Sequence, residues 1–412
     1  MCGRVKPSDF SYTVDMETEL IAFRRYLHAN AEVGFSMDKT LAFIEEKLKE
    51  MGYAPQKCGK AGLLASVGKG KKKVLLRADI DGLPIAEKTG LPYACKNGRM
   101  HACGHDMHAA MLLGAAKLLK EREEELGGEI RLLFQPAEEL LEGAKDCIEN
   151  GAVDGVKAGC MIHVLTALDL PMSAIIVSSE GVSAPAADFF EIEILGKGCH
   201  GSAPWKGVDA LTVAARILLG LEEISAREIS PASPFVLTVG SVSAGEAQNA
   251  LSNCAVLRGT LRAFDEETRV FAKRRMEQIA KNTAQAFRAR ARVRYGGGCP
   301  TLVNDGEASR IALSSAKELV GEKLAFTSQQ LGSDVKKNSG GSEDFAYIAS
   351  KVPSVMIGLV AGSREQGYVY PLHHPKVRFD ESVLLLGAEL YASVGRALLA
   401  YEKNIPRNHE KR

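Results

Sequence analysis

Several features that would place the chain in a class at once are missing. Its 412 residues include a single tryptophan, and no apolar run approaches the roughly 20 residues of a membrane-spanning helix. Neither an H-E-x-x-H sequence nor a G-x-S-x-G elbow occurs, so zincin and serine-hydrolase chemistry find no support. The class must therefore come from weaker patterns that agree with one another.

An excess of charge of one sign is also missing. The chain has 52 basic and 51 acidic residues, for a net charge of +1. Nucleic acids and anionic membrane surfaces attract proteins with a basic excess, so we expect neither as a partner. The nine cysteines are odd in number and irregularly spaced, and residues 1–6 lack the apolar core of a secretory signal. These features predict reduced thiols and a cytoplasmic location.

The length of the chain favours two domains, and its apolar pattern predicts an α/β architecture. Short apolar runs, typical of buried strands, alternate with helical patterns. The expected strands are 62–67, 74–78, 130–134, 159–164, 174–177 and 353–360, and the expected helical regions are 17–50 and 109–120. This alternation predicts a mixed, largely parallel sheet with helices on both faces.

Near residue 183 the pattern changes to strands in which apolar and polar residues alternate. The expected elements are strand 190–194, helix 208–227, strands 235–242 and 255–264, a helix capped by Asp265, and strand 291–295 ended by the glycines of 296–298. This β-α-β-β-α-β order predicts a ferredoxin-like unit with an antiparallel sheet. We therefore expect a domain made of 1–183 and 298–412, interrupted by an inserted domain at 184–297.

The densest group of metal-binding residue types is the segment His101-Ala-Cys-Gly-His-Asp-Met-His108. Thiolate and imidazole ligands favour zinc-like transition metals over magnesium or calcium. Not every member needs to bind metal, because Asp106 could cap the helix that follows it. His101 and His108 are expected to support the site from behind the ligands.

Further ligand types stand at the ends of predicted strands. Glu138-Glu139 follows one strand, His163 lies in another, and His373-His374 lies near the C-terminus. Each has an alternative explanation: the carboxyl pair could favour a helix N-terminus, and His163 could be a hydrogen-bonded core histidine. Their common position at strand ends, where α/β enzymes place their sites, favours a site with enough ligands for two metal ions.

One motif points elsewhere and is set aside. The segment Gly196-Lys-Gly-Cys-His-Gly201 fits the G-x-G-x-x-G pattern of dinucleotide-binding proteins. No helix is expected directly after its last glycine, because Ser-Ala-Pro204 follows, so a phosphate would have no helix N-terminus to bind.

Taken together, these segments resemble a known family. The matching segments are Leu76-Arg-Ala-Asp-Ile-Asp-Gly-Leu-Pro84, His101-Ala-Cys-Gly-His-Asp106, Phe134-Gln-Pro-Ala-Glu-Glu139, His163, Gly198-Cys-His-Gly-Ser202, Gly340-Gly-Ser-Glu-Asp-Phe345 and Leu372-His-His-Pro375. In these segments and their order, the chain resembles the di-metal amidohydrolases of the aminoacylase and hippurate hydrolase family, which are related to the glutamate carboxypeptidases. Arg77 stands where related peptidases have a histidine, which favours the amidohydrolase branch.

The resemblance implies a two-metal site and roles for individual residues. The implied ligands of two divalent ions (zinc, manganese, cobalt or nickel) are Cys103, His105, Glu139, His163 and His373. Cys103 would bridge the two ions, Glu138 would be the general base, and Asp79 would orient a ligand.

The resemblance also implies that the inserted domain is a lid and dimerisation domain of a homodimer. His200 would reach the active site of the partner subunit, and Asn249 and Arg262 would bind a substrate carboxylate. Three departures from the family pattern leave the preferred acyl group and amino acid open: Trp205 in place of a histidine, and missing prolines after His28 and after Asn249.

The implied activity is metal-dependent hydrolysis of the amide bond of small N-acyl amino acids, for example N-acetyl or N-benzoyl amino acids. Two alternatives stay open. A dipeptidase or carboxypeptidase would use the same metal site on another substrate, and a non-catalytic homologue would bind metal without turnover.

Overall fold

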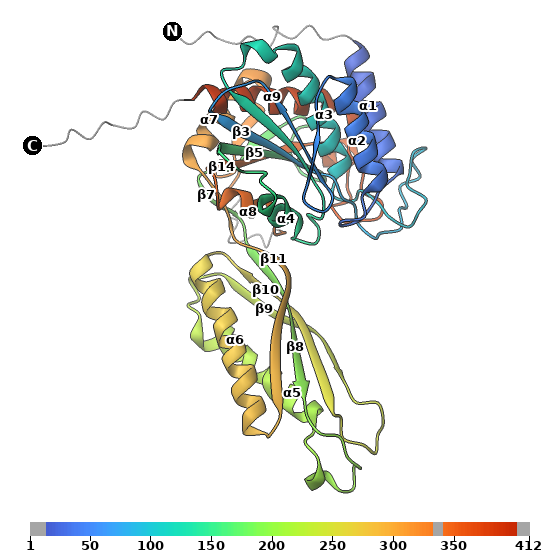
Figure 1. Cartoon of the computed structure of the whole chain (residues 1–412), viewed down its shortest axis with the longest axis vertical. Helices are drawn as coiled ribbons and strands as arrows, with labels where there is room; N and C mark the ends of the chain where they lie inside the picture. The colour runs from blue at the N-terminus through green and yellow to red at the C-terminus, as the bar shows by residue number, and fades with distance from the viewer. Residues whose placement is uncertain (1–13, 333–340, 402–412) are drawn as a thin grey trace, which may run out of the picture.

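The structure is a computed structural model that describes residues 14–332 and 341–401. Its main strands form an eight-stranded sheet and a separate four-stranded sheet, each covered by helices. Figure 1 shows the larger unit above and the smaller unit below, joined by the chain at β8 and β11. Gly340, the first residue of one motif, lies outside the described residues.

The large sheet has the order β1-β2-β4-β3-β5-β14-β6-β13. Its strands are β1 (Gln56–Cys58), β2 (Gly62–Val67), β3 (Lys73–Asp79), β4 (Glu129–Gln135), β5 (Val156–Leu165), β6 (Ile175–Val177), β13 (Ala325–Thr327) and β14 (Ser354–Val360). The four central strands are parallel to one another, and β1, β2 and β6 pair antiparallel with a neighbour. The predicted mixed, largely parallel sheet is confirmed. A short ribbon of β7 (Gly181–Ala184) and β12 (Leu302–Asn304) lies beside it.

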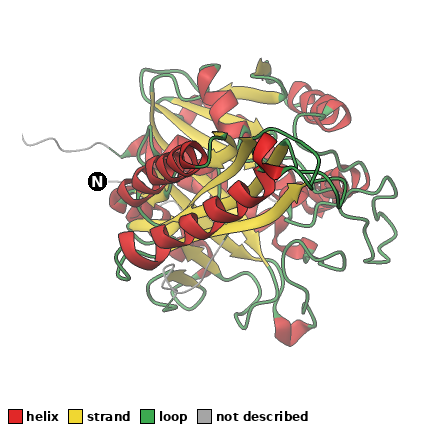
Figure 2. Ribbon diagram, turned by 90° about the horizontal axis from the view of Figure 1, so that it is seen from below, coloured by secondary structure: helices red, strands yellow, loops and turns green. Residues whose placement is uncertain are grey.

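Helices cover both faces of this sheet, as predicted (Figures 1 and 2). One face carries α1 (Val14–Ala29), α2 (Asp38–Glu50), α3 (His105–Glu121), α7 (Gly306–Val320) and α9 (Leu384–Ala400), whose apolar residues share one core with the strands. The other face carries α4 (Gly143–Glu149) and α8 (Phe345–Ala349), which pack into a second core. The helical region expected at 17–50 is interrupted, because the chain turns at 30–37, where Gly34 has φ 61°.

The segment Glu381–Ala400 corrects one expectation. The segment is 20 residues long, and an 18-residue stretch of it has a mean hydropathy of 1.5, so it could span a membrane by length and composition. In this fold 61% of that stretch is buried inside the protein, and α9 packs against α3. Its apolar composition is therefore explained by its position in the core of the large unit.

The small unit has the predicted β-α-β-β-α-β order. Its elements are β8 (Ala186–Leu195), α5 (Ala210–Glu223), β9 (Phe235–Ala244), β10 (Cys254–Ala263), α6 (Glu266–Ala286) and β11 (Arg290–Cys299). The sheet is antiparallel with the order β11-β8-β10-β9, and Asp265 caps α6 by accepting from the Thr268 amide. Both helices pack on one face, and the other carries ion pairs such as Arg258 with Glu191. The domain boundaries at 184 and 297 stay a prediction.

The end of the last strand was placed too early. The glycines of 296–298 do not end β11, which continues to Cys299. The register against β8 shifts between Tyr295 and Gly298, so one extra residue on β11 forms a bulge. Glycines in an alternating pattern therefore mark a bend in the strand here, and the strand carries the chain back to the large unit.

Candidate metal centre

The predicted metal ligands meet at one edge of the large sheet. β3 and β4 end side by side at the paired residues Asp79 and Gln135, and His163 lies near the end of β5. Loops after these strands and the start of α3 supply the other residues. Parallel strands present their carboxyl ends at one edge, which is why segments far apart in sequence converge there.

All five predicted ligands lie in two overlapping groups. One potential ligand atom from each of Cys103, His105 and His163 lies within 4.8 Å of the others. The same limit holds for Cys103, Glu139 and His373. Cys103 belongs to both groups, so its thiol occupies the position that a ligand shared by two ions needs.

The imidazoles are oriented so that one ring nitrogen faces the cluster. His105 Nδ1 lies 2.8 Å from the backbone oxygen of Asp81, and His163 Nδ1 lies 2.7 Å from that of Val164. These carbonyls accept the Nδ1 protons and leave each Nε2 with a lone pair. His105 Nε2 is fully buried and has no hydrogen-bond partner in the described part of the chain. A buried nitrogen without a partner is costly unless a metal ion binds it, so the donor set fits transition-metal ions.

The Cys103 thiol has the electrostatic environment of a thiolate. Burial alone would raise its pKa, but the nearby His163 and His105 outweigh burial and lower the pKa to about 6. Cys103 Sγ lies 3.5 Å from His163 Nε2. Since thiolate is the form that binds metal, this environment favours the ligand role.

His373 joins the cluster from a loop, with its side chain about half exposed. Its backbone has φ 64°, an unusual value for a residue other than glycine, and its amide donates to the Ala102 carbonyl over 2.9 Å. His373 Nε2 lies 3.4 Å from Glu139 Oε1. The hydrogen bond to Ala102 therefore helps to hold His373 in a strained backbone conformation, in which its imidazole faces Glu139.

Asp81 positions the adjacent pair Glu138 and Glu139. Its two carboxylate oxygens accept the Glu138 amide over 3.1 Å and the Glu139 amide over 3.3 Å. The preceding Ala137 has φ 54°, so the chain turns sharply before the pair. No role was predicted for Asp81 from the sequence, although it lies in the segment 76–84 that resembles the family. The available signal was an aspartate two residues after the end of a buried strand.

Glu138 has a strongly raised proton affinity. Burial raises its pKa well above the usual value, and the negative charges of Glu343, Asp344 and Glu139 raise it further. A carboxylate that takes up a proton readily at neutral pH has the property that a general base needs. Glu139 groups with Cys103 and His373, and one carboxylate oxygen from each of Glu138 and Glu139 also lies within 4.8 Å of the other and of a ring nitrogen of His105.

Arg77 neutralises the carboxylates behind the cluster. Its buried guanidinium forms ion pairs with Asp79 at 2.7 Å, Glu343 at 3.0 Å and Asp344 at 2.7 Å. These residues belong to two of the segments that resemble the family, but their ion pairs were not predicted from the sequence. The signal was an arginine in the otherwise apolar strand Val74–Ala78, because a buried charge needs partners.

We expect Arg77→Met to destabilise the fold strongly, because it leaves three buried carboxylates without a counter-charge. The expected loss is about 3–5 kcal/mol in the free energy of unfolding, measured by urea denaturation. Arg310→Met is the matched control, since Arg310 pairs with Glu307 on the surface and its side chain is 64% exposed. That control should change stability by less than about 1 kcal/mol. Equal, small effects of both variants would contradict the role assigned to Arg77.

Asp79 and His108 stand behind the ligands. His108 Nδ1 hydrogen-bonds Asp79 Oδ1, and its Nε2 accepts the Val164 amide over 2.8 Å, so both ring nitrogens are occupied. Asp79 Oδ2 also lies 3.7 Å from His105 Nε2, which agrees with an orienting role. Asp106 does not cap α3: the N-cap residue is Gly104, and Asp106 pairs with the buried Arg24 at 2.7 Å.

The residues expected to bind substrate lie in the small unit, apart from the cluster. His200 pairs with Ala250 in an isolated bridge, and the Gly201 amide donates to the Asn249 carbonyl over 2.6 Å, so His200 and Asn249 lie close together on two exposed loops. Arg262 is half-buried on β10, 5.5 Å from the Phe189 ring centre. No contact recorded within 14–332 and 341–401 joins these three residues to the metal cluster.

Comparisons with known proteins agree with this geometry. Residues 75–397 match the model of the group described as peptidase family M20/M25/M40. An N-acetyl-L-cysteine deacetylase of Bacillus subtilis is 36% identical over 94% of this chain and 90% of its own length. A thermostable carboxypeptidase 2 of Saccharolobus solfataricus is 34% identical over 92% of this chain and 95% of its own length.

A solved structure extends the similarity to three dimensions. The crystal structure of a dinuclear metal-binding peptidase of the M20 family from Bacillus subtilis is similar with a TM-score of 0.74 and 31% identity. The match covers 94% of this chain and 99% of that one. The similarity therefore includes both the large and the small unit.

Proposed function

The chain belongs to peptidase family M20/M25/M40, and we propose that it hydrolyses the amide bond of N-acyl amino acids to release the free amino acid and a carboxylic acid. It is accordingly a hydrolase, and the proposal concerns its substrate. The observation that supports amide hydrolysis is Glu138 beside a cluster of five predicted ligands in which Cys103 is shared, and the choice of substrate rests on the similarity to known proteins. The similarity to an N-acetyl-L-cysteine deacetylase supports the choice of an N-acyl substrate.

We propose that two divalent transition-metal ions (zinc, manganese, cobalt or nickel) bind in the cluster. His105 and His163 with Cys103 would hold one, and Glu139 and His373 with the same thiolate would hold the other. When bound, such ions supply Lewis-acid polarisation of the carbonyl and make water easier to deprotonate. The protein supplies the geometry, which Asp81 fixes through His105 and both glutamates.

Glu138 carries out the proton transfers of the reaction. It accepts a proton from the attacking water as the water oxygen bonds to the amide carbon, and the carbonyl electrons move to oxygen. It then gives the proton to the amide nitrogen, so that the C–N bond breaks and a neutral amine leaves. His200 is proposed to stabilise the oxyanion from the partner subunit, and Asn249 and Arg262 are proposed to bind the substrate carboxylate.

A homodimer is part of this proposal, because His200 lies on the small unit, away from the cluster of its own chain. β9 is at the edge of the small sheet, and its side chains Val236 and Val242 are 45% and 54% exposed. An exposed edge strand can pair with the same strand of a second copy. Sedimentation should give twice the 44.3 kDa chain mass, and a monomer with full activity would contradict the role of His200.

A peptidase is the second candidate, favoured by the similarity to a thermostable carboxypeptidase. It would use the same cluster and the same base on a peptide bond. A third candidate is a metal-binding protein without catalytic activity. The presence of Glu138, a carboxylate placed to act as general base, argues against it.

A substrate panel distinguishes these functions. The purified, metal-loaded protein should release amino acids from N-acetyl and N-benzoyl amino acids with a kcat/KM at least about tenfold above that for dipeptides and C-terminal peptide substrates. Higher kcat/KM on peptides would replace the proposal by the peptidase function. No turnover of any substrate with zinc, manganese, cobalt or nickel would favour the non-catalytic protein.

A further inference from the structure

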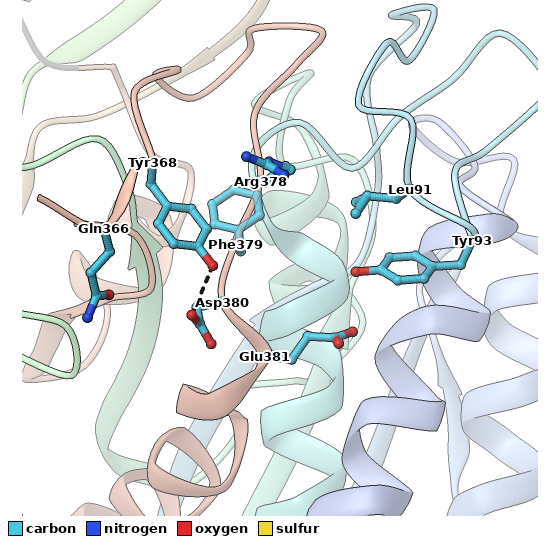
Figure 3. A pocket seen from close by; sticks show the side chains of 8 residues that line it. All are labelled: Leu91, Tyr93, Gln366, Tyr368, Arg378, Phe379, Asp380 and Glu381. Carbon is cyan, nitrogen blue, oxygen red and sulfur yellow. Dashed lines mark hydrogen bonds between the residues drawn. The ribbon is translucent and has the colours of Figure 1, made fainter. Parts of the chain in front are cut away.

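A cavity of about 430 Å³ lies beside the metal cluster without sharing a residue with it. We call it the tyrosine cavity, and its lining residues are Leu91, Tyr93, Gln366, Tyr368, Arg378, Phe379, Asp380 and Glu381. Figure 3 shows the tyrosine hydroxyls and the two carboxylates directed into the same space. The Phe379 ring lies against Gly104, the residue before His105, so the cavity borders the segment that carries two of the predicted ligands.

In the part of the chain that the structure describes, the cavity contains two charges of opposite sign without a charged partner. Asp380 accepts hydrogen bonds from neutral donors, among them the Tyr368 hydroxyl and the Ser382 amide, each over 2.9 Å. These bonds outweigh burial and lower the pKa of Asp380, so the group is a carboxylate. Arg378 is exposed at the mouth of the cavity and has no ion pair within the described ranges. Glu381 differs, because Arg24 and Arg25 pair with it at 3.1 and 2.6 Å.

Aromatic rings line the cavity together with the two unpaired charges. Arg378 and Asp380 flank the buried Phe379 in the chain. In Figure 3 the rings of Tyr368, Phe379 and Tyr93 border the same space as the Arg378 guanidinium and the Asp380 carboxylate. A ligand that satisfies both charges needs an anionic group, a cationic group and an apolar surface.

We propose that the tyrosine cavity is a second binding site, which takes a free amino acid with an apolar or aromatic side chain. The amino-acid carboxylate pairs with Arg378, which offers a planar fork of donors. The ammonium group pairs with Asp380 and the Tyr368 hydroxyl, and the side chain packs on Phe379 and Tyr93. A volume of this size suits a ligand of one or two residues.

A chain of buried contacts links this site to the metal-binding helix. Arg24 donates to the Tyr93 hydroxyl and to Glu381, which both line the cavity. The same guanidinium donates from Nε to Asp106 over 2.7 Å, and Asp106 follows His105 in the first turn of α3. An amino acid in the cavity is therefore linked through the buried pair Arg24 and Asp106 to the residue next to the predicted ligand His105. The binding site itself does not depend on which amide the enzyme cleaves.

Isothermal titration of the metal-loaded protein with L-phenylalanine tests the proposal. Arg378→Gln and Asp380→Asn should each weaken binding about tenfold or more while the fold is kept, since asparagine can still cap the turn that follows residue 380. Arg364→Gln, on the neighbouring loop outside the cavity, is the matched control and should not change binding. Phenylacetate and phenethylamine, which each lack one charged group, should bind at least tenfold more weakly than L-phenylalanine.

Three outcomes would overturn the proposal. The first is no binding of L-phenylalanine up to millimolar concentration. The second is binding that His373→Ala abolishes and that Arg378→Gln and Asp380→Asn leave unchanged, which would place the amino acid at the metal cluster alone. The third is phenylacetate binding as tightly as L-phenylalanine, which would make the cavity a site for anions only.

Discussion

Glu138→Gln is expected to lower kcat by about 10² to 10⁴, the range that general acid–base groups contribute, while metal content stays at the wild-type level. The amide of glutamine cannot accept the proton of the attacking water, but it keeps the size of the side chain. Because burial and the nearby Glu343 and Asp344 disfavour a charge at this position, the neutral variant should be at least as stable as the wild type. Steady-state kinetics, metal analysis and urea denaturation on the same preparation measure the three quantities.

Glu142→Gln is the matched control for this substitution. Glu142 lies three residues beyond the predicted metal ligand Glu139, is exposed, and makes no side-chain capping bond to α4. It should retain wild-type kcat and metal content. A Glu138→Gln enzyme with more than about a tenth of wild-type kcat would remove Glu138 from the base role, and one that lost metal would make it a ligand instead.

Cys103→Ala is expected to have the second large effect, because the thiol is the one atom common to both ligand groups. In the proposed arrangement, its removal would take a ligand from both ions at once. Mutation of residues that only orient the ligands typically lowers metal affinity by about 10- to 100-fold, so the loss of a shared ligand should lower it further. Metal affinity and kcat/KM should each fall by more than about 100-fold, measured by metal-buffer titration and by amino-acid release.

Cys160→Ala is the control for the loss of a buried thiol. Cys160 lies on β5, three residues before His163, and burial raises the pKa of its thiol, so it is a core residue. Its replacement should leave metal affinity unchanged. If Cys103→Ala kept both ions and near-normal activity, the shared-thiolate arrangement would be wrong.

Much of the fold could be predicted because its signals are local. The buried strands β2 to β5 appear in the sequence as short apolar runs, and the small unit shows alternating strands between helices. The predicted metal ligands could also be found from local signals. A histidine within an apolar strand, or a carboxyl pair directly after one, is visible without knowing the fold, and strand ends are where such residues meet.

The support behind the ligands could not be predicted, because it depends on contacts between distant segments. Arg77 meets Glu343 and Asp344 only after the chain has passed through the small unit and returned. The pairing of Asp106 with Arg24 likewise needs α1 to pack on α3. The left-handed backbone of His373 has no local signal at all, since the residue is neither glycine nor asparagine.

The central claim is that two metal ions share Cys103 beside Glu138. An anomalous-difference map from crystals of the metal-loaded protein tests it most directly. The account predicts two peaks per chain, both about 2.3 Å from Cys103 Sγ, one about 2.1 Å from His105 and His163 and the other about 2.1 Å from Glu139 and His373. A single peak, or peaks that lie away from Cys103, would contradict it.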